Sequence, residues 1–135
     1  MKRLLMLALA SVMLSSFTTK SPSAASVYPI VVKFLSTGAG VPSDEPLRRA
    51  VLSFKKKNKL KLIQAARIAP LGKEGEYYMG FEMNEMTVRQ KKEFITAIRA
   101  VVGEMDDRGK AEVEQNVAYS SIPTSSRTTT QVVAF

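Results

Sequence analysis

Ser53 and Lys56 are the two residues whose types and spacing come nearest to a catalytic pair. On a helix the lysine would lie one turn from the serine, as in enzymes that pair a serine nucleophile with a lysine base. Such a lysine must be buried to lose its proton near neutral pH. The surrounding segment is rich in lysine, and the chain lacks the companion motifs S-D-N and K-T-G. We therefore interpret the pair as part of a solvated helix face.

The carboxylates and glycines give no stronger catalytic signal. Glu76 and Glu82 share one face of a predicted strand, but about 20 Å of strand separates them, too far for a general acid–base pair. The glycine turn at 38–40 precedes a helix, yet Asp44 and Glu45 follow it and would repel a phosphate. The chain has no His and no Cys, which excludes histidine triads, thiolate chemistry and the usual zinc sites. The sequence therefore predicts no catalytic residue, no metal site and no cofactor.

The strongest charged feature is the run KKKNKLK at residues 55–61. Such a run could bind nucleic acid, heparin-like chains or an anionic membrane. Cations at this position also complement the dipole at a helix C-terminus, so a purely structural role stays open. The candidate basic residues are Arg48, Arg49, Lys55, Lys56, Lys57, Lys59 and Lys61.

The N-terminus has the pattern of a secretory signal peptide. A basic start at 1–3 is followed by the apolar run Leu4–Leu14 and by small residues ending at Ala25. The apolar run is shorter than the roughly 20 residues that span a bilayer, which argues against a membrane anchor. We expect cleavage of residues 1–25 and a periplasmic or secreted protein. Without cysteine, a cysteine-anchored lipoprotein is excluded.

The first predicted strand, Val27–Ser36, is apolar on both sides, which is typical of the middle of a sheet. A helix is predicted to start at Ser43 or Asp44 and to end at Asn58 in a left-handed conformation. A second helix opens at Thr87 with a capping box to Gln90. At period two, one side of the strand holds Tyr28, Ile30, Val32 and Phe34, and the other holds Val31, Lys33 and Leu35. The apolar stripes of the helices are Leu47, Ala50, Val51 and Phe54, and Phe94, Ile95, Ile98, Val101, Val102 and Met105.

Three further segments complete the expected domain. Leu60–Ala69 mixes apolar and basic residues and is predicted to be an edge strand, whereas Glu76–Met83 has a consistently apolar face. Lys110–Tyr119 alternates like a strand, although its AEVEQ segment is also compatible with a helix. The Ser/Thr-rich segment 120–135 is predicted to be a flexible or extended tail.

The order strand, helix, strand, strand, helix, strand predicts an α+β domain over residues 26–119. It is that of the ferredoxin-like βαββαβ sandwich, with a four-stranded antiparallel sheet and two helices on one face. The first and third strands would be central, and the second sheet face would be open. The candidate binding residues on that open face are Val31, Lys33, Leu35, Tyr78 and Glu82.

The chain also resembles the propeptide-like inhibitors of subtilisin-type proteases. Their first strand is similar to Tyr28–Val32, and their Gly-Phe strand before a Ser/Thr-capped helix is similar to Gly80-Phe81 with Thr87 and Gln90. Their closing Val-Glu strand is similar to Val113-Glu114. The resemblance implies that the open sheet face packs on a protease. It also implies that the segment after the last strand, here Ser120–Phe135, enters the active site.

The sequence thus predicts an exported, non-enzymatic binding module. The expected partner is another protein, bound through the open sheet face or the tail. The alternative is an anionic polymer or membrane surface, bound through the basic residues. Nucleic acid is disfavoured by export and because Tyr77 and Phe81 share their strand face with methionines, as core residues do. An enzyme would need a residue set that the sequence does not offer.

Overall fold

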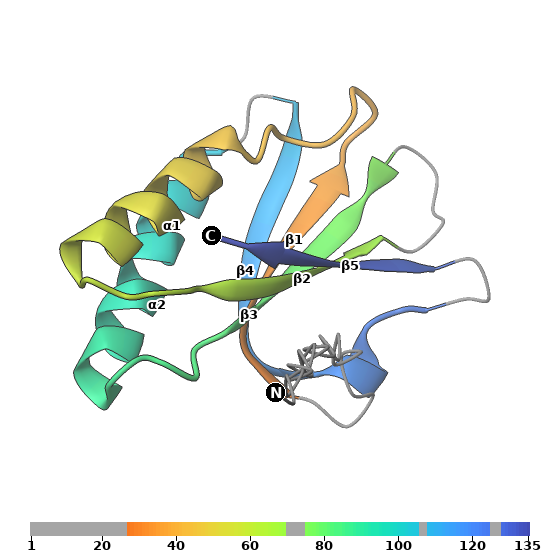
Figure 1. Cartoon of the computed structure of the whole chain (residues 1–135). Coiled ribbons are helices and arrows are strands. Elements are labelled where there is room, and N and C mark those ends of the chain that lie inside the picture. Colours follow the sequence, from red (N-terminus) through yellow and green to blue (C-terminus); the bar gives the residue numbers. More distant parts are fainter. Residues whose placement is uncertain (1–26, 70–74, 106–107, 125–127) are drawn as a thin grey trace, which may run out of the picture.

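The computed structural model describes residues 27–69, 75–105, 108–124 and 128–135, and the predicted signal peptide lies outside them. These residues form an antiparallel five-stranded sheet with two helices on one face (Figure 1). The strand order is β4-β1-β3-β2-β5. In chain order the elements are β1 (Val27–Ser36), α1 (Glu45–Lys57), β2 (Gln64–Ala69), β3 (Tyr77–Glu82), α2 (Val88–Val102), β4 (Gly109–Ala118), a 3-10 turn (Tyr119–Ser121) and β5 (Thr129–Ala134).

The first four strands follow a ferredoxin-like order, with β1 and β3 in the centre as predicted. The prediction of only four strands is wrong, because β5 pairs with β2. For the same reason β2 is not an edge strand. Its ladder starts at Gln64, and Ile63 extends the contact by exchanging backbone hydrogen bonds with Phe135. The segment TTQVVA is rich in residues that favour strands, so it is suited to the extended conformation in which it pairs with β2.

The first helix and its end at Asn58 are confirmed, but the predicted conformation of Asn58 is wrong. Asp44 is the N-cap, but its side chain makes no capping hydrogen bond, and the Ser43 hydroxyl accepts from the N–H of Glu45 at 3.3 Å instead. Asn58 ends the helix with φ −92°, so the predicted left-handed conformation is wrong. Its side-chain amide donates to the carbonyl of Phe54 at 3.0 Å, which holds Asn58 in the last turn. The left-handed residue is the next one, Lys59, with φ 52°.

The second helix is capped as predicted. The Thr87 hydroxyl accepts from the N–H of Gln90 at 3.2 Å, and the N–H of Thr87 donates to the Gln90 side chain at 2.9 Å. Both bonds satisfy backbone donors that the first turn of a helix leaves without a partner. Gly103 is the C-cap of this helix.

The main core lies between the helices and the sheet. Phe94 of α2 is fully buried and makes edge-on ring contacts with Phe54 of α1, at 5.1 Å, and with Phe81 of β3, at 5.5 Å. On the same side, Phe34 stacks on Tyr77 at 4.4 Å. The predicted apolar face of the third strand is confirmed, since Tyr77, Met79, Phe81 and Met83 are all buried in this core.

The sheet face opposite the helices, called the far face below, carries a second cluster. It is not open as predicted, because Ile122, just after the 3-10 turn, is buried there. Tyr28 belongs to this cluster, so its predicted place beside Ile30 is wrong. Tyr28 pairs with Val117 of β4 and Ile30 pairs with Gln115. Between these two pairs Pro29 interrupts the ladder, and Asn116 on β4 takes φ 53°. The distortion turns Tyr28 to the other face. The buried members are Tyr28, Val31, Ala66, Ile68 and Ile122.

Candidate functional site

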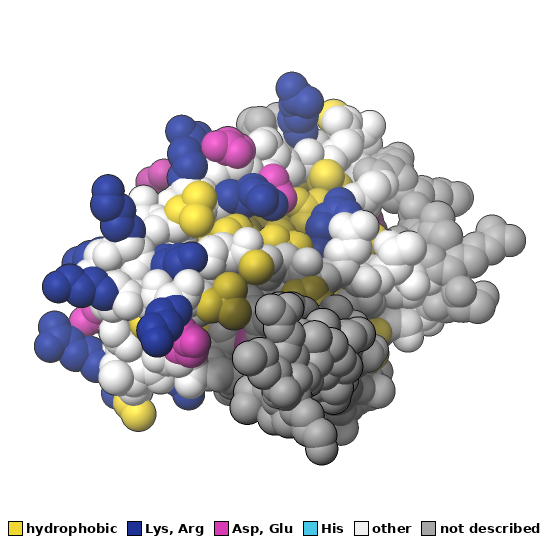
Figure 2. Space-filling view, in the orientation of Figure 1, with side chains coloured by type: hydrophobic (Ala, Val, Ile, Leu, Met, Phe, Trp, Pro, Cys, Tyr) yellow, Lys and Arg dark blue, Asp and Glu magenta, His cyan; other side chains and the backbone are white. Residues whose placement is uncertain are grey.

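Charge is distributed unevenly between the two layers. We define the helix layer as the segments 44–63 and 87–104, which hold both helices and the chain at their ends. It contains 11 basic and 4 acidic residues, whereas the rest of the described chain contains 4 basic and 5 acidic ones. Figure 2 shows many Lys and Arg side chains on the side where the helices lie. The helix layer therefore carries all of the basic excess of the described residues and is the candidate site.

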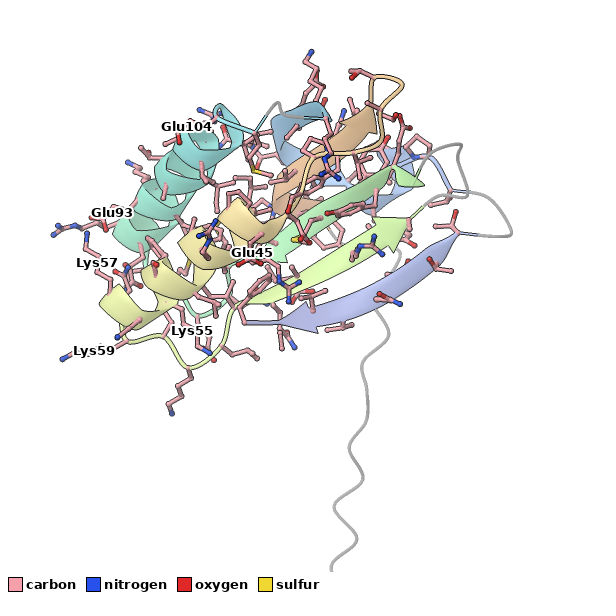
Figure 3. The ribbon with its side chains drawn as sticks, turned by 90° about the horizontal axis from the view of Figure 1, so that it is seen from above. Glu45, Lys55, Lys57, Lys59, Glu93 and Glu104 are labelled. Carbon is pink, nitrogen blue, oxygen red and sulfur yellow. The ribbon has the colours of Figure 1, made fainter. Side chains whose placement is uncertain are left out.

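The amphipathic pattern of α1 points its cations outward. Leu47, Val51 and Phe54 are buried against the sheet, so the other side of the helix faces solvent. Lys57 and Lys59 project from its C-terminal end, with Glu93 across from them on α2 (Figure 3). Within the described part of the chain five exposed lysines make no ion pair or hydrogen bond through their side chains: Lys56, Lys57, Lys59, Lys61 and, on α2, Lys92.

Three of the predicted basic residues are instead engaged in the fold. Arg48 and Arg49 lie 3.9 Å and 3.7 Å from carboxylate oxygens one turn earlier, on Asp44 and Glu45. Arg48 also lies over the ring of Phe135, 5.5 Å from its centroid. Lys55 donates to the carbonyl oxygen of Phe135 at 2.6 Å. The structure thus divides the predicted patch into structural cations and freely accessible ones.

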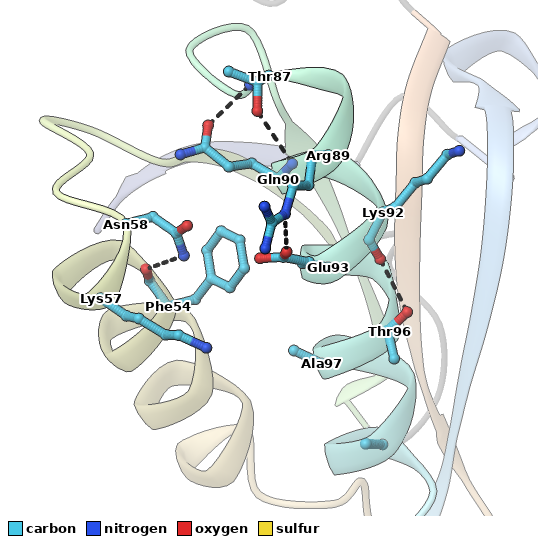
Figure 4. Close-up of a pocket in the computed structure, with 11 residues that line it drawn as sticks. Phe54, Lys57, Asn58, Thr87, Arg89, Gln90, Lys92, Glu93, Thr96 and Ala97 are labelled. Atoms are coloured by element: carbon cyan, nitrogen blue, oxygen red, sulfur yellow. Dashed lines mark hydrogen bonds and ion pairs between the residues drawn. The ribbon is translucent and has the colours of Figure 1, made fainter.

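A groove of about 750 Å³ runs between the two helices (Figure 4). Lys57 on α1 and Arg89 on α2 direct their cations into the groove, whereas Lys92 lines its rim with its side chain pointing away from α1. Among the described residues, the only carboxylate in its lining belongs to Glu93, which pairs with Arg89 at 2.8 Å. This hydrogen bond raises the pKa of Arg89, whose guanidinium is in any case charged at physiological pH. The remaining lining residues are Phe54, Asn58, Thr87, Gln90, Thr96, Ala97 and Ala100.

The contribution of α2 to this groove escaped the sequence reasoning, which followed the lysine run alone. Arg89, Lys92, Glu93 and Thr96 fall on one side of α2, away from the buried Phe94 stripe. A helical projection of both helices would have shown their outer sides to be basic. The pairing of α1 with α2 across a groove depends on the packing of the two helices, which the projection does not contain.

The predicted far-face residues do not form one exposed surface. Val31 is buried in the far-face cluster, and Lys33 forms an ion pair with Glu114 of β4. Lys33 and Tyr78 are register partners, so these two are brought together. The residues other than Val31 are half-buried: Lys33, Leu35, Tyr78 and Glu82.

The serine–lysine pair, the strand glutamate and the glycine turn show no arrangement that indicates catalysis or ligand binding. Ser53 and Lys56 are both exposed on α1. The carboxylate of Glu76 accepts from the backbone N–H of Ser36 at 3.0 Å. The glycine turn is solvent-accessible, with φ 107° at Gly38 and 99° at Gly40. Among the described residues no three carboxylates are grouped as metal ligands would be, and no helix is long and apolar enough to cross a membrane.

Comparisons with protein-family models, with curated proteins and with solved structures gave no match. The function therefore has to be inferred from the residues themselves. The resemblance to propeptide-like protease inhibitors stays a hypothesis. The segment that it would place in an active site contains β5, and Phe135 at its end is buried.

Proposed function

We propose that this chain is an exported binding module whose helix layer holds a linear anionic polymer, such as a carboxylated or sulfated polysaccharide. The observation that carries the proposal is the set of unpaired lysines beside the basic groove between α1 and α2. These cations form no internal ion pairs that a ligand would have to break. They also come from two helices far apart in the sequence, so the fold assembles them.

The groove favours a polymer over a flat surface. A chain can lie between Lys57 and Arg89 and contact both helices, whereas a membrane would reach only the outermost side chains. The lining of Thr87, Gln90 and Thr96 offers hydroxyl and amide groups of the kind that bind sugar hydroxyls. The far face and the C-terminal segment have weaker support as partner surfaces, since Val31 and Phe135 are buried by the chain itself.

Binding of this kind is electrostatic and depends on salt. Exposed cations separated by more than a Debye length of about 10 Å at 0.1 M act almost independently, so each contributes modestly. Neutralising several anionic groups releases counterions, and the logarithm of the binding constant falls linearly with the logarithm of the salt concentration. A wild-type protein that binds heparin, used as the probe, should lose affinity steeply as salt rises.

The proposal is tested by reversing charges inside and outside the helix layer. The test variant carries Lys56→Glu and Lys57→Glu, and the control carries Arg108→Glu and Lys110→Glu, at exposed positions beside and within β4. Both variants change the net charge equally. We expect the test variant to elute from heparin at much lower salt and to reduce the salt slope by roughly two. The control should shift little.

Two results would contradict the proposal. Equal shifts in both variants would mean that the column senses only the net charge. Failure of the wild-type protein to bind heparin at low salt would rule out an anionic polymer as the ligand. Binding to vesicles of anionic lipid that exceeds binding to heparin, with the same response to the helix-layer variant, would assign the surface to membranes instead.

A further inference from the structure

The free edge of β5 is the second unusual surface of the molecule, and it is independent of the helix layer. In the part of the chain that the structure describes, β5 has a partner on one side only, because it is the last strand in the sheet. Its residues are TTQVVA, without a charge or a proline. Natural edge strands usually carry such features, because an unprotected edge pairs with other strands. Val132 in its middle is 59% exposed.

The other edge of the sheet is protected. β4 carries Lys110, Glu112 and Glu114 along its length. Near its end Asn116 takes a left-handed φ of 53°, which breaks the regular spacing of backbone groups. A strand added there would meet charges and a distorted ladder. The contrast between the two edges indicates that β5 is the edge open to pairing.

The hydrogen-bond register identifies the groups that β5 presents. Ile63 and Phe135 exchange both backbone hydrogen bonds, at 3.4 Å and 3.0 Å. Such exchanging pairs alternate along an antiparallel ladder, so Val133 and Gln131 also direct their backbone groups toward β2. The residues between them, Thr130, Val132 and Ala134, therefore direct their N–H and C=O groups outward.

We propose that β5 pairs antiparallel with β5 of a second copy of this chain, about a two-fold axis at Val132. This register opposes Val132 to Val132 and Thr130 to Ala134, so all three outward residues of each strand exchange hydrogen bonds. The chain after the predicted signal peptide has 17 basic and 12 acidic residues and so repels its own copies, and the absence of charged side chains on residues 128–135 makes this strand a suitable place for two copies to meet. The pairing closes on itself, as isologous dimers do.

The dimer would have one consequence for ligand binding, which rests on the proposed function. Paired side chains across an antiparallel ladder point to the same face, so the two-fold axis stands perpendicular to the sheet. Both helix layers then lie on the same face of a continuous ten-stranded sheet. A long anionic polymer could contact both, and avidity would raise its affinity above that of a monomer. The dimer itself does not depend on this.

The experiment uses disulfide cross-linking. The chain has no cysteine of its own, so an introduced cysteine is the only thiol that can react. Opposed residues of an exchanging pair lie about 5.5 Å apart at Cα, within the range of a disulfide. We expect Val132→Cys to give a disulfide-linked dimer under mild oxidation. The matched control is Leu52→Cys on α1, since Leu52 is similarly exposed at 50%. Equal cross-linking of both variants would overturn the proposal.

Sedimentation equilibrium without cysteine provides the second measurement. The wild-type mass should rise toward that of a dimer with concentration, and Val132→Pro should stay monomeric. Because the N–H of residue 132 points outward, proline there removes no bond to β2, and circular dichroism should show an intact fold. A dimer that survives Val132→Pro, a wild-type monomer at every concentration, or growth beyond the dimer would each refute the two-fold pairing. If each helix layer of the monomeric Val132→Pro variant binds heparin with unchanged affinity, the proposed function holds independently of the dimer.

Discussion

Lys55 on α1 donates a hydrogen bond to the carbonyl oxygen of Phe135, at 2.6 Å, and so joins the first helix to the last residue of the chain. Eighty positions separate these two residues in the sequence. The Phe135 ring also packs against Phe81 at 6.0 Å and beneath the guanidinium of Arg48. The C-terminal segment is therefore part of the core, and its removal should be felt as a loss of stability.

We expect Phe135→Ala to lower the free energy of unfolding by about 3 kcal/mol, the usual range for a buried phenylalanine. Lys55→Met should cost about 1 kcal/mol, the net value of one hydrogen bond. Lys57→Met is the control, since Lys57 makes no such bond within the described chain, and it should change stability little. Urea unfolding followed by circular dichroism measures all three. A neutral Phe135→Ala would show that β5 contributes nothing to the core.

Gly80 is predicted to be intolerant of any side chain. A Cβ at this position would lie 2.6 Å from Cγ of Tyr28, whose ring is fully buried over it. Gly80→Ala must therefore displace the ring or β3, and we expect a loss of about 1–3 kcal/mol in urea unfolding. The double variant with Tyr28→Ala should show strong non-additivity, because the second substitution removes the clash. Additive losses would mean that the two residues do not meet.

Tyr28→Phe tests the same contact from the other side. The hydroxyl of Tyr28 is buried and has no hydrogen-bond partner among the described residues. Burying such a group without a partner costs about 1–3 kcal/mol, so its removal should leave stability unchanged or raise it. Thermal unfolding of the variant beside the wild type measures the difference. A clear loss would reveal a partner for this hydroxyl.

The capping box of α2 allows a matched comparison of two threonines on one helix. Thr87→Ala removes the hydroxyl that accepts from Gln90, and the cost should be about 1 kcal/mol. Thr96→Ala removes only a hydroxyl that donates to the carbonyl of Lys92, which is already bonded within the helix. It should be neutral or slightly stabilising. Equal effects of the two substitutions in urea unfolding would contradict the capping role.

Much of the fold could be read from local pattern. Thr87 and Gln90 predicted a helix start, and the apolar residues on both sides of Val27–Ser36 predicted a central strand. Both predictions depend only on residues that are close together in the sequence. The place of β5 could not be read, since its pairing with β2 is decided by contacts between Phe135 and Ile63, far apart in the chain. Tyr28 was misplaced because a period-two count assumes a regular strand, and Pro29 interrupts it.

The candidate site was predictable only in part. The lysine run is visible as composition, but composition does not tell Lys55, which bonds to Phe135, from Lys57, which faces the groove. That distinction depends on where the C-terminal segment returns. Arg89 and Lys92 entered the site only when α2 was placed beside α1. The sequence pattern predicts the exposed cations of one helix at a time, whereas the groove is formed by two helices packed side by side.

Stability at high pH should depend on two tyrosines. Burial raises the pKa of Tyr77 well above its ordinary value near 10, and the nearby carboxylate of Asp44 raises it further. Arg67, whose guanidinium lies 4.1 Å from the ring centroid, acts in the opposite direction. Burial likewise raises the pKa of Tyr28, with smaller contributions from Glu82 and Tyr119. Both phenols therefore stay neutral in the folded protein at a pH where they ionise in the unfolded chain.

The sign of the effect follows from proton counting. Above about pH 10 the unfolded state binds fewer protons than the native state, so the free energy of unfolding falls as pH rises. Each such group contributes a slope of up to about 1.4 kcal/mol per pH unit. Urea unfolding between about pH 9 and pH 12 should show this fall, and Tyr77→Phe should reduce its slope, because phenylalanine has no proton to lose. An unchanged slope in Tyr77→Phe, with the fold intact at neutral pH, would mean that Tyr77 ionises without unfolding the protein.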